Sequence, residues 1–185
     1  MKNLRLLLLT AFAIMALAAA AEQPDPVITS IRDAYQKAKV MMKQNKGMGN
    51  ELVTKSNYTV RGKGKTTETI HFFYNTVEGT YMMDDDGDPH FFFYPVYFIT
   101  RNYNIGKQKY YEEFLFDPSS QRLLFALIQD YDENGKRVDR RYYYHDGNLY
   151  DVVGPPSDPF TNERVYYWSY ELRHAFDWLM RNPKE

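Results

Sequence analysis

The sequence has 185 residues, with 23 lysines and arginines against 24 aspartates and glutamates, and it contains no cysteine. The near-neutral charge gives little electrostatic support for binding nucleic acid or anionic membranes. Without cysteine the chain has no disulfide, no thiolate zinc site and no catalytic thiol. Tyrosine occurs 17 times and phenylalanine 12 times, and aromatic residues favour the half-buried surface of a β-sheet.

Residues 1–21 form a predicted secretory signal peptide. Two cations precede an apolar run over residues 6–21 that ends in four alanines, which is the order of features in such a leader. The run is shorter than the ~20 apolar residues of a membrane-spanning helix. We therefore expect cleavage after Ala20 or Ala21 rather than retention as an anchor. The sequence predicts an exported protein, periplasmic or secreted, that is soluble and is not a lipoprotein.

The next element is a predicted amphipathic helix over residues 26–46. Asp25 supplies a capping carboxylate, and Pro26 suits the first helical position. Apolar side chains then recur at spacings of three and four, which indicates one apolar face: Val27, Ile31, Ala34, Tyr35, Ala38, Met41 and Met42. Because this face is modest and basic residues are few, we expect it to pack on the protein's own sheet rather than on a membrane surface.

Residues 51–153 show an apolar period of two, broken by short turn signals such as Asp-Gly and Asn-Gly. Strands joined in succession by short turns form an antiparallel meander, here of about six to eight strands. The predicted strands lie near residues 52–61, 66–75, 78–83, 91–100, 108–116, 122–131, 136–145 and 148–153.

Three strands have a distinct character. Residues 123–128, LLFALI, are apolar on both faces, which predicts an interior strand covered on both sides. Polar residues alternate through residues 54–61, which suits a half-exposed strand. Pro95 interrupts the run HFFFYPVYF, so we expect that strand to be an edge strand or to carry a bulge.

The chain ends in a Pro-rich linker over residues 154–160 and a helix over about residues 163–181. Residues 165–168 also fit a last strand, which leaves the start of this helix open. The predicted fold is α+β: one domain over residues 22–185, with an antiparallel meander between an N-terminal helix and a C-terminal helix packed on the sheet.

Residues 82–90, MMDDDGDPH, concentrate carboxylates before a histidine. Asp84, Asp86 and Asp88 have the spacing of the first three ligands in an EF-hand calcium loop, but the glycine and glutamate required later are replaced by Pro89 and Pro95. Asp and Gly are also common turn residues. We therefore predict a charged turn without a specific metal site, and at most weak calcium binding.

No catalytic motif is present in the sequence. The histidines at positions 71, 90, 145 and 174 form no HExxH pair, and no serine lies in a G-x-S-x-G sequence. Glu112 and Glu113 are adjacent, and adjacent strand residues point to opposite faces, so they cannot flank one scissile bond. An enzyme is therefore disfavoured, and no cofactor is predicted.

The most suggestive stretch for binding is the Arg/Tyr strand over residues 137–145. Arg140 and Tyr142 share one face of it, and Arg141 and Tyr143 share the other. Arginine and tyrosine commonly anchor interfaces, but so aromatic a chain also forms such clusters by chance, and we favour a cross-strand aromatic ladder. If the strand is instead a binding surface, one of these pairs should be open to solvent.

These observations favour a non-enzymatic exported protein that binds an envelope protein or a glycan through an aromatic sheet surface. An envelope hydrolase acting on glycan or peptide is one alternative, and a structural accessory domain is another. The hydrolase hypothesis predicts a deep cleft with a carboxylate pair or a His–acid pair, whereas the binding hypothesis predicts a shallow aromatic surface. Nucleic acid is not an expected partner, and no membrane span is expected after signal cleavage.

Overall fold

The computed structural model describes residues 24–44, 50–62, 64–76, 82–83, 89–90, 94–156 and 159–181. The predicted signal peptide lies outside these residues, as do Asp84, Asp86 and Asp88 of the acidic turn. Both remain predictions.

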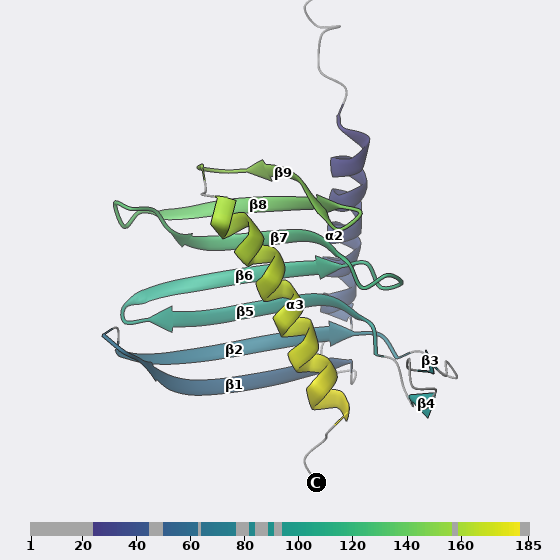
Figure 1. Ribbon diagram of the computed structural model, residues 1–185, viewed down its shortest axis with the longest axis horizontal. Helices are drawn as coiled ribbons and strands as arrows, with labels where there is room; N and C mark the ends of the chain where they lie inside the picture. Colours follow the sequence, from purple (N-terminus) through teal and green to yellow (C-terminus); the bar gives the residue numbers. More distant parts are fainter. Residues whose placement is uncertain are drawn as a thin grey trace, which may run out of the picture.

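The described chain forms a seven-stranded antiparallel sheet between two helices, which confirms the predicted α+β architecture (Figure 1). Helix α2 (Pro26–Gln44) lies behind the sheet, and α3 (Pro159–Arg181) crosses its front. The strand order is β1-β2-β5-β6-β7-β8-β9. The bounds are β1 Glu51–Val60, β2 Gly64–Tyr74, β5 Val96–Ile105, β6 Gln108–Phe116, β7 Leu123–Tyr131, β8 Arg137–His145 and β9 Asn148–Val153. Two short strands, β3 (Met82–Met83) and β4 (Pro89–His90), pair with each other.

Each face of the sheet carries a row of apolar and aromatic side chains that lie directly opposite one another on neighbouring strands. The row under α3 consists of Phe72, Ile99, Phe114, Ala126 and Tyr142. The row under α2 consists of Phe73, Phe98, Leu115, Phe125 and Tyr143. Every member is at most 6% exposed. Since neighbouring residues of a strand point to opposite faces, the sheet needs a cover on both sides.

The two helices supply these covers. From α3, Val165, Leu172 and Phe176 are buried, and the Phe176 ring lies 5.4 Å from that of Phe72. Burying a side chain of this size contributes about 2–3 kcal/mol. From α2, Ile31 and Ala38 are buried against the other row. The sheet is therefore the middle layer of three.

Helix α2 begins as the sequence predicts. The Asp25 carboxylate accepts hydrogen bonds from the backbone N–H groups of Val27 and Ile28, at 2.8 and 3.1 Å. This satisfies donors that have no partner within the helix. The structure gives the last residue of α2 as Gln44, and residues 45 and 46 of the predicted helix lie outside the described part.

Several details of the strands test the sequence predictions. Strand β7, which contains LLFALI, lies between β6 and β8 and contacts both helices, which confirms it as an interior strand. Strand β5 begins at Val96, directly after Pro95, and pairs with β2 and β6. The edge-strand alternative for this segment is therefore wrong. Instead, the β2–β5 register is irregular here, because Phe73 pairs with Phe98 but Tyr74 pairs with Val96. The proline is tolerated because it precedes the ladder.

The C-terminal helix starts earlier than predicted. Because α3 already includes residues 165–168, the alternative of a last strand there is wrong. The linker is correspondingly shorter than residues 154–160, since α3 begins at Pro159. None of the helices within the described residues is long and apolar enough to cross a membrane.

Candidate functional site

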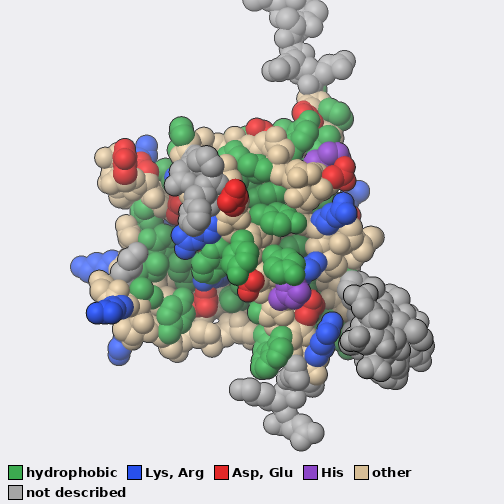
Figure 2. Space-filling view, in the orientation of Figure 1, with side chains coloured by type: hydrophobic (Ala, Val, Ile, Leu, Met, Phe, Trp, Pro, Cys, Tyr) green, Lys and Arg blue, Asp and Glu red, His purple; other side chains and the backbone are tan. Residues whose placement is uncertain are grey.

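A groove of about 490 Å³ lies between the first half of α3 and the sheet. We call it the α3 groove. Its lining comes from β1, β5, β6, β7 and α3: Tyr58, Val60, Arg101, Tyr103, Ile105, Tyr110, Glu112, Phe114, Ile128, Asp130, Thr161, Arg164, Val165 and Trp168. Hydrophobic side chains gather on this face of the molecule along the course of α3 (Figure 2). Its volume lies in the usual range for a small-molecule site.

The floor of the groove is a buried ion-pair network centred on Arg101. The Arg101 side chain donates to Glu68 at 2.6 Å and to Glu112 at 3.2 Å, and the Tyr103 hydroxyl donates to Glu112 at 3.0 Å. Arg101 lies directly opposite Glu112 in the β5–β6 register. The sheet register thus holds both charges in place, and only 7% of Arg101 and 8% of Glu112 is exposed.

The network raises the pKa of two of its members, Arg101 and Tyr103. Burial opposes the charge on Arg101, but the carboxylates of Glu112 and Glu68 outweigh it and raise the pKa of Arg101. Burial raises the pKa of Tyr103, and Glu112 raises it further. The guanidinium therefore stays charged and the phenol stays protonated at neutral pH, so both act as hydrogen-bond donors.

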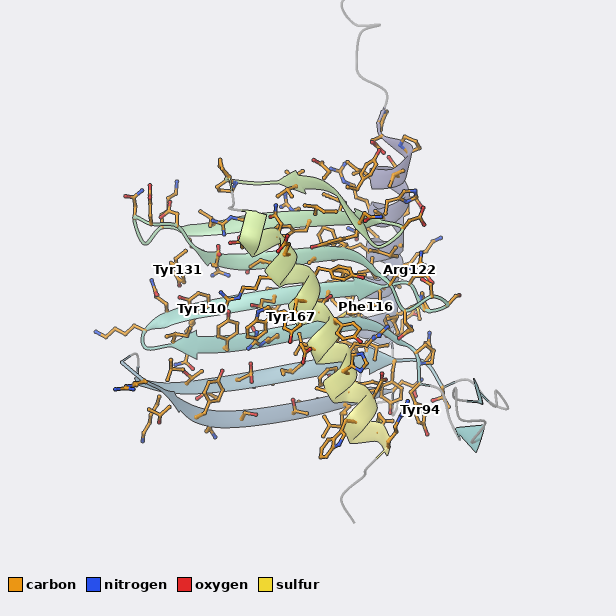
Figure 3. All side chains as sticks on the ribbon, viewed as in Figure 1. Tyr94, Tyr110, Phe116, Arg122, Tyr131 and Tyr167 are labelled. Atoms are coloured by element: carbon orange, nitrogen blue, oxygen red, sulfur yellow. The ribbon has the colours of Figure 1, made fainter. Side chains whose placement is uncertain are left out.

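Aromatic rings form the walls. Tyr103 and Tyr110 stack with ring centroids 4.9 Å apart and planes 5° apart. The Tyr131 ring meets Tyr110 edge-on at 5.4 Å, and the two labelled side chains lie on the same side of α3 in Figure 3. On β1, Tyr58 is 41% exposed. Trp168 closes the groove from α3, with the Arg101 guanidinium 4.6 Å from its ring centroid.

A second carboxylate enters the groove from β7. Asp130 lies two residues beyond Ile128, which is opposite Glu112, so the carboxylates of Glu112 and Asp130 share the α3 face. Arg140 donates to Asp130 at 2.6 Å. Burial nevertheless raises the pKa of Asp130, because the desolvation of its carboxylate outweighs the attraction of Arg140.

The residues predicted as a binding surface are mostly buried. Arg140, Tyr142 and Tyr143 are 8%, 0% and 2% exposed, while Arg141 is exposed. The alternative of an open Arg/Tyr pair is therefore wrong on both faces, because each pair has at least one buried member. The reason is that α3 covers the face of Tyr142, whereas α2 covers that of Tyr143, over whose ring Arg32 lies at 5.8 Å. Arg140 contributes to the α3 groove only by holding Asp130.

The groove residues were missed because they come from four strands and a helix. The sequence contains two weak indications of the groove. Arg101 and Tyr103 are two residues apart on one strand, and Tyr110 and Glu112 are two residues apart on the next, so each pair shares one face of the sheet. The prediction that Glu112 and Glu113 point to opposite faces of the sheet is confirmed. Glu112 lines the groove on the α3 side, and Glu113 accepts a hydrogen bond from Lys39 of α2 at 2.7 Å on the other side.

His71, His145 and His174 do not line the α3 groove. His71 pairs with Glu51 at 2.6 Å, and His174 packs on Tyr170 with ring centroids 4.1 Å apart. Among the described residues, no group of three or more histidines, aspartates and glutamates could hold a metal ion. The groups that the groove offers to a ligand are therefore aromatic rings, carboxylates and guanidinium groups.

Comparison with protein-family models, curated proteins and solved structures finds no match.

Proposed function

We propose that this is an exported, non-enzymatic protein that binds a glycan in the α3 groove. The observation that carries the proposal is the combination of aromatic walls with a floor of carboxylates and a guanidinium. Pyranose rings present C–H faces that pack on aromatic rings, and their hydroxyls bond well to planar carboxylate and guanidinium groups. Tyr58, Tyr110 and Trp168 supply the rings, while Arg101, Glu112 and Asp130 supply the planar polar groups.

The rigidity of the floor supports binding. Arg101 is held by Glu68 and Glu112, and Glu112 is held in turn by Tyr103. Side chains already fixed in the free protein lose little conformational entropy when a ligand docks. The proposal of export depends separately on the leader-like composition of residues 1–21.

A second candidate is a glycoside hydrolase that uses Glu112 and Asp130. It is favoured by the placement of both carboxylates on one face and by the raised pKa of Asp130, which is a property of general acids. Against it, each carboxylate is already bonded to a buried arginine, Arg101 or Arg140. This arrangement suits a preorganised binding floor better than a free acid and base.

The test is binding to an array of neutral, acidic and amino-sugar oligosaccharides, followed by calorimetry on the best ligand. Tyr110→Ala removes one wall of the groove, and we expect it to weaken binding by about tenfold or more. Tyr167→Ala is the matched control, because Tyr167 is 61% exposed on α3 and does not line the groove (Figure 3).

Equal binding by wild type, Tyr110→Ala and Tyr167→Ala would contradict the proposal, as would the lack of any oligosaccharide ligand. Incubation of the bound oligosaccharide with the protein separates the two candidates. New reducing ends that disappear in Asp130→Asn would establish the hydrolase, whereas unchanged ligand is expected for a binding protein.

A further inference from the structure

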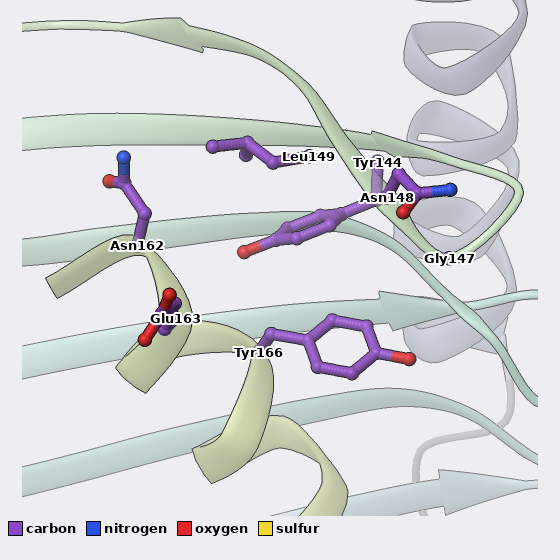
Figure 4. A pocket seen from close by; sticks show the side chains of 7 residues that line it. All are labelled: Tyr144, Gly147, Asn148, Leu149, Asn162, Glu163 and Tyr166. Carbon is purple, nitrogen blue, oxygen red and sulfur yellow. The ribbon is translucent and has the colours of Figure 1, made fainter. Parts of the chain in front are cut away.

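A second cavity of about 400 Å³ lies between the β8–β9 turn and the first turns of α3 (Figure 4). We call it the turn cavity. Its lining consists of Tyr144, Gly147, Asn148, Leu149, Asn162, Glu163 and Tyr166. None of these residues lines the α3 groove, to which α3 contributes Thr161, Arg164, Val165 and Trp168 instead. The two cavities therefore use different sides of the same helix.

The Tyr144 hydroxyl is the most informative atom of this cavity. The Tyr144 side chain is 2% exposed, and its hydroxyl has no hydrogen-bond partner among the described residues. In Figure 4 that hydroxyl points across the cavity toward Asn162 and Glu163 of α3. A buried hydroxyl without a partner is costly, and in native proteins it usually has a bound molecule or a functional reason.

The surrounding groups define what fits beside this hydroxyl. Asn148 and Asn162 contribute side-chain amides, of which that of Asn148 also donates to the Asp146 carbonyl oxygen at 3.3 Å, while Leu149 and the Tyr166 ring contribute apolar surface. The rings of Tyr144 and Tyr166 lie 5.7 Å apart and are tilted by 43°. Burial raises the pKa of Tyr144, so its phenol stays protonated and can donate a hydrogen bond at neutral pH.

Charge narrows the ligand class further. Among the residues that the structure describes, the lining has no lysine or arginine, and its single carboxylate, Glu163, is exposed. An anionic ligand would meet that carboxylate with no cation to offset it. A cationic ligand would find only this exposed carboxylate, while the buried group that needs a partner is an uncharged phenol. A neutral ligand with several hydroxyls and one apolar face matches the whole lining.

We infer that the turn cavity is a second, independent binding site for one neutral polyhydroxylated ring, a single sugar residue of pyranose size. A ring hydroxyl satisfies Tyr144, further hydroxyls bond to Asn148 and Asn162, and the C–H face lies against Tyr166. The assignment does not depend on the α3 groove binding a glycan.

The experiment is an NMR titration of the full-length protein, labelled with nitrogen-15, using neutral methyl glycosides as probes at millimolar concentration. Methyl glucoside, methyl galactoside and methyl N-acetylglucosaminide cover the common ring types. We expect saturable shifts of the backbone N–H signals of Gly147, Asn148 and Asn162 with at least one probe. Tyr144→Phe removes only the hydroxyl, and it should weaken that binding by about tenfold.

The same variant separates a ligand role from a structural one. Because the Tyr144 hydroxyl has no described partner in the free protein, Tyr144→Phe should melt at the same temperature as wild type or at a higher one. Asn148→Ala changes an exposed side chain at the first position of β9 and should also weaken binding without unfolding. Tyr110→Ala, in the other groove, should leave the shifts unchanged.

Three results would overturn the inference. The first is the lack of saturable shifts at these positions with any of the glycosides. The second is equal binding by wild type and Tyr144→Phe. The third is stronger binding of ethylammonium than of any glycoside, which would assign the cavity to an amine.

Discussion

Glu113 is the residue that fixes α2 to the sheet. Its carboxylate is almost fully buried and accepts hydrogen bonds from Tyr35 and Tyr111, while Lys39 donates at 2.7 Å. Burial and the neighbouring carboxylate both raise the pKa of Tyr35 and of Tyr111, so these phenols remain donors. A buried charge with this many partners is well compensated, and it loses that compensation if it is changed.

We therefore expect Glu113→Gln to lower the free energy of unfolding by about 2–3 kcal/mol, since it weakens charge-assisted hydrogen bonds at a buried position. Chemical denaturation of the purified protein measures this. Glu133→Gln is the control, because Glu133 is exposed in a turn and should change stability by less than about 0.5 kcal/mol. Equal stability of the two variants would show that Glu113 does not hold α2.

Asp25 gives the fold a dependence on acid pH. The Tyr150 hydroxyl donates to its carboxylate at 2.7 Å, and the N–H groups of Ile28 and Val27 donate as well. Together they lower the pKa of Asp25 below its ordinary value of 3.8. Because the pKa of Asp25 is lower in the folded state, its stabilisation is fully present above the unfolded-state pKa of 3.8. The stabilisation is lost as the pH falls from that value through the folded-state pKa.

The expected result is that the melting temperature of wild type falls more steeply below pH 3.8 than that of Asp25→Asn. Asparagine keeps the cap but has no charge to titrate. Thermal unfolding monitored by circular dichroism across this pH range is the measurement. Parallel profiles for the two proteins would mean that the Asp25 carboxylate does not contribute.

At the scale of elements, the end of β9 depends on one glycine. Gly154 has φ of 138°, and a Cβ at this position would lie 2.6 Å from the Asp139 carbonyl oxygen and 3.1 Å from the Arg140 Cα. Both atoms are backbone and cannot move aside as a flexible side chain does. After the end of β9, the backbone at position 154 passes so close to the backbone of β8 that only glycine fits there.

Gly154→Ala should accordingly destabilise the protein by about 3 kcal/mol, from backbone strain and overpacking together. Gly135→Ala provides the comparison, since Gly135 also has positive φ, at 73°, but a Cβ there meets nothing within 4 Å. It should cost only about 1 kcal/mol. Denaturant unfolding of both variants decides the point, and a Gly154→Ala protein no less stable than Gly135→Ala would refute it.

The elements were largely predictable because each leaves a local pattern. The apolar period of residues 26–46, the turn signals between strands and the doubly apolar run at residues 123–128 all record which faces are buried. The burial of Arg140 and Tyr142 was not predictable in this way, because a period of two shows that they share a face but not what covers it. The cover over these residues is α3, and the path of that helix across the sheet leaves no pattern in the sequence of the strand.

The α3 groove was unpredictable for a related reason. Arg101 and Glu112 meet only because the β5–β6 register places them opposite each other, and a slip of one residue would put one of them on the other face. Trp168 reaches them only through the crossing of α3. Pairing register and helix placement are tertiary properties, so the site emerges only when the whole fold is known.

At the scale of the whole molecule, the proposal of export makes a direct prediction. Cleavage of the leader after Ala20 or Ala21 leaves a mature chain that begins at Ala21 or Glu22. Mass spectrometry of the protein recovered from the culture medium or the periplasm measures the new N-terminus. An intact Met1 in the membrane fraction would contradict signal cleavage.

The three-layer arrangement leaves two cavities on the side of the sheet that α3 crosses. Helix α2 packs along one side of the sheet, whereas α3 crosses the other and leaves cavities on either side of its first half. The α3 groove, which contains the buried Arg101 network, is the site of the proposed function. If a glycan binds there, it should alter the environment of Trp168, which lines the groove.

A fluorescence titration of Trp168 tests this claim most directly. The chain has two tryptophans, and Trp178→Phe leaves Trp168 as the single reporter; Trp178 is 61% exposed and does not line the groove. Titration with the oligosaccharide selected on the array should give a saturable change in Trp168 emission. The midpoint should shift by about tenfold or more when Tyr110→Ala is added. An unchanged emission at ligand concentrations that saturate calorimetric binding would place the ligand elsewhere and contradict the account.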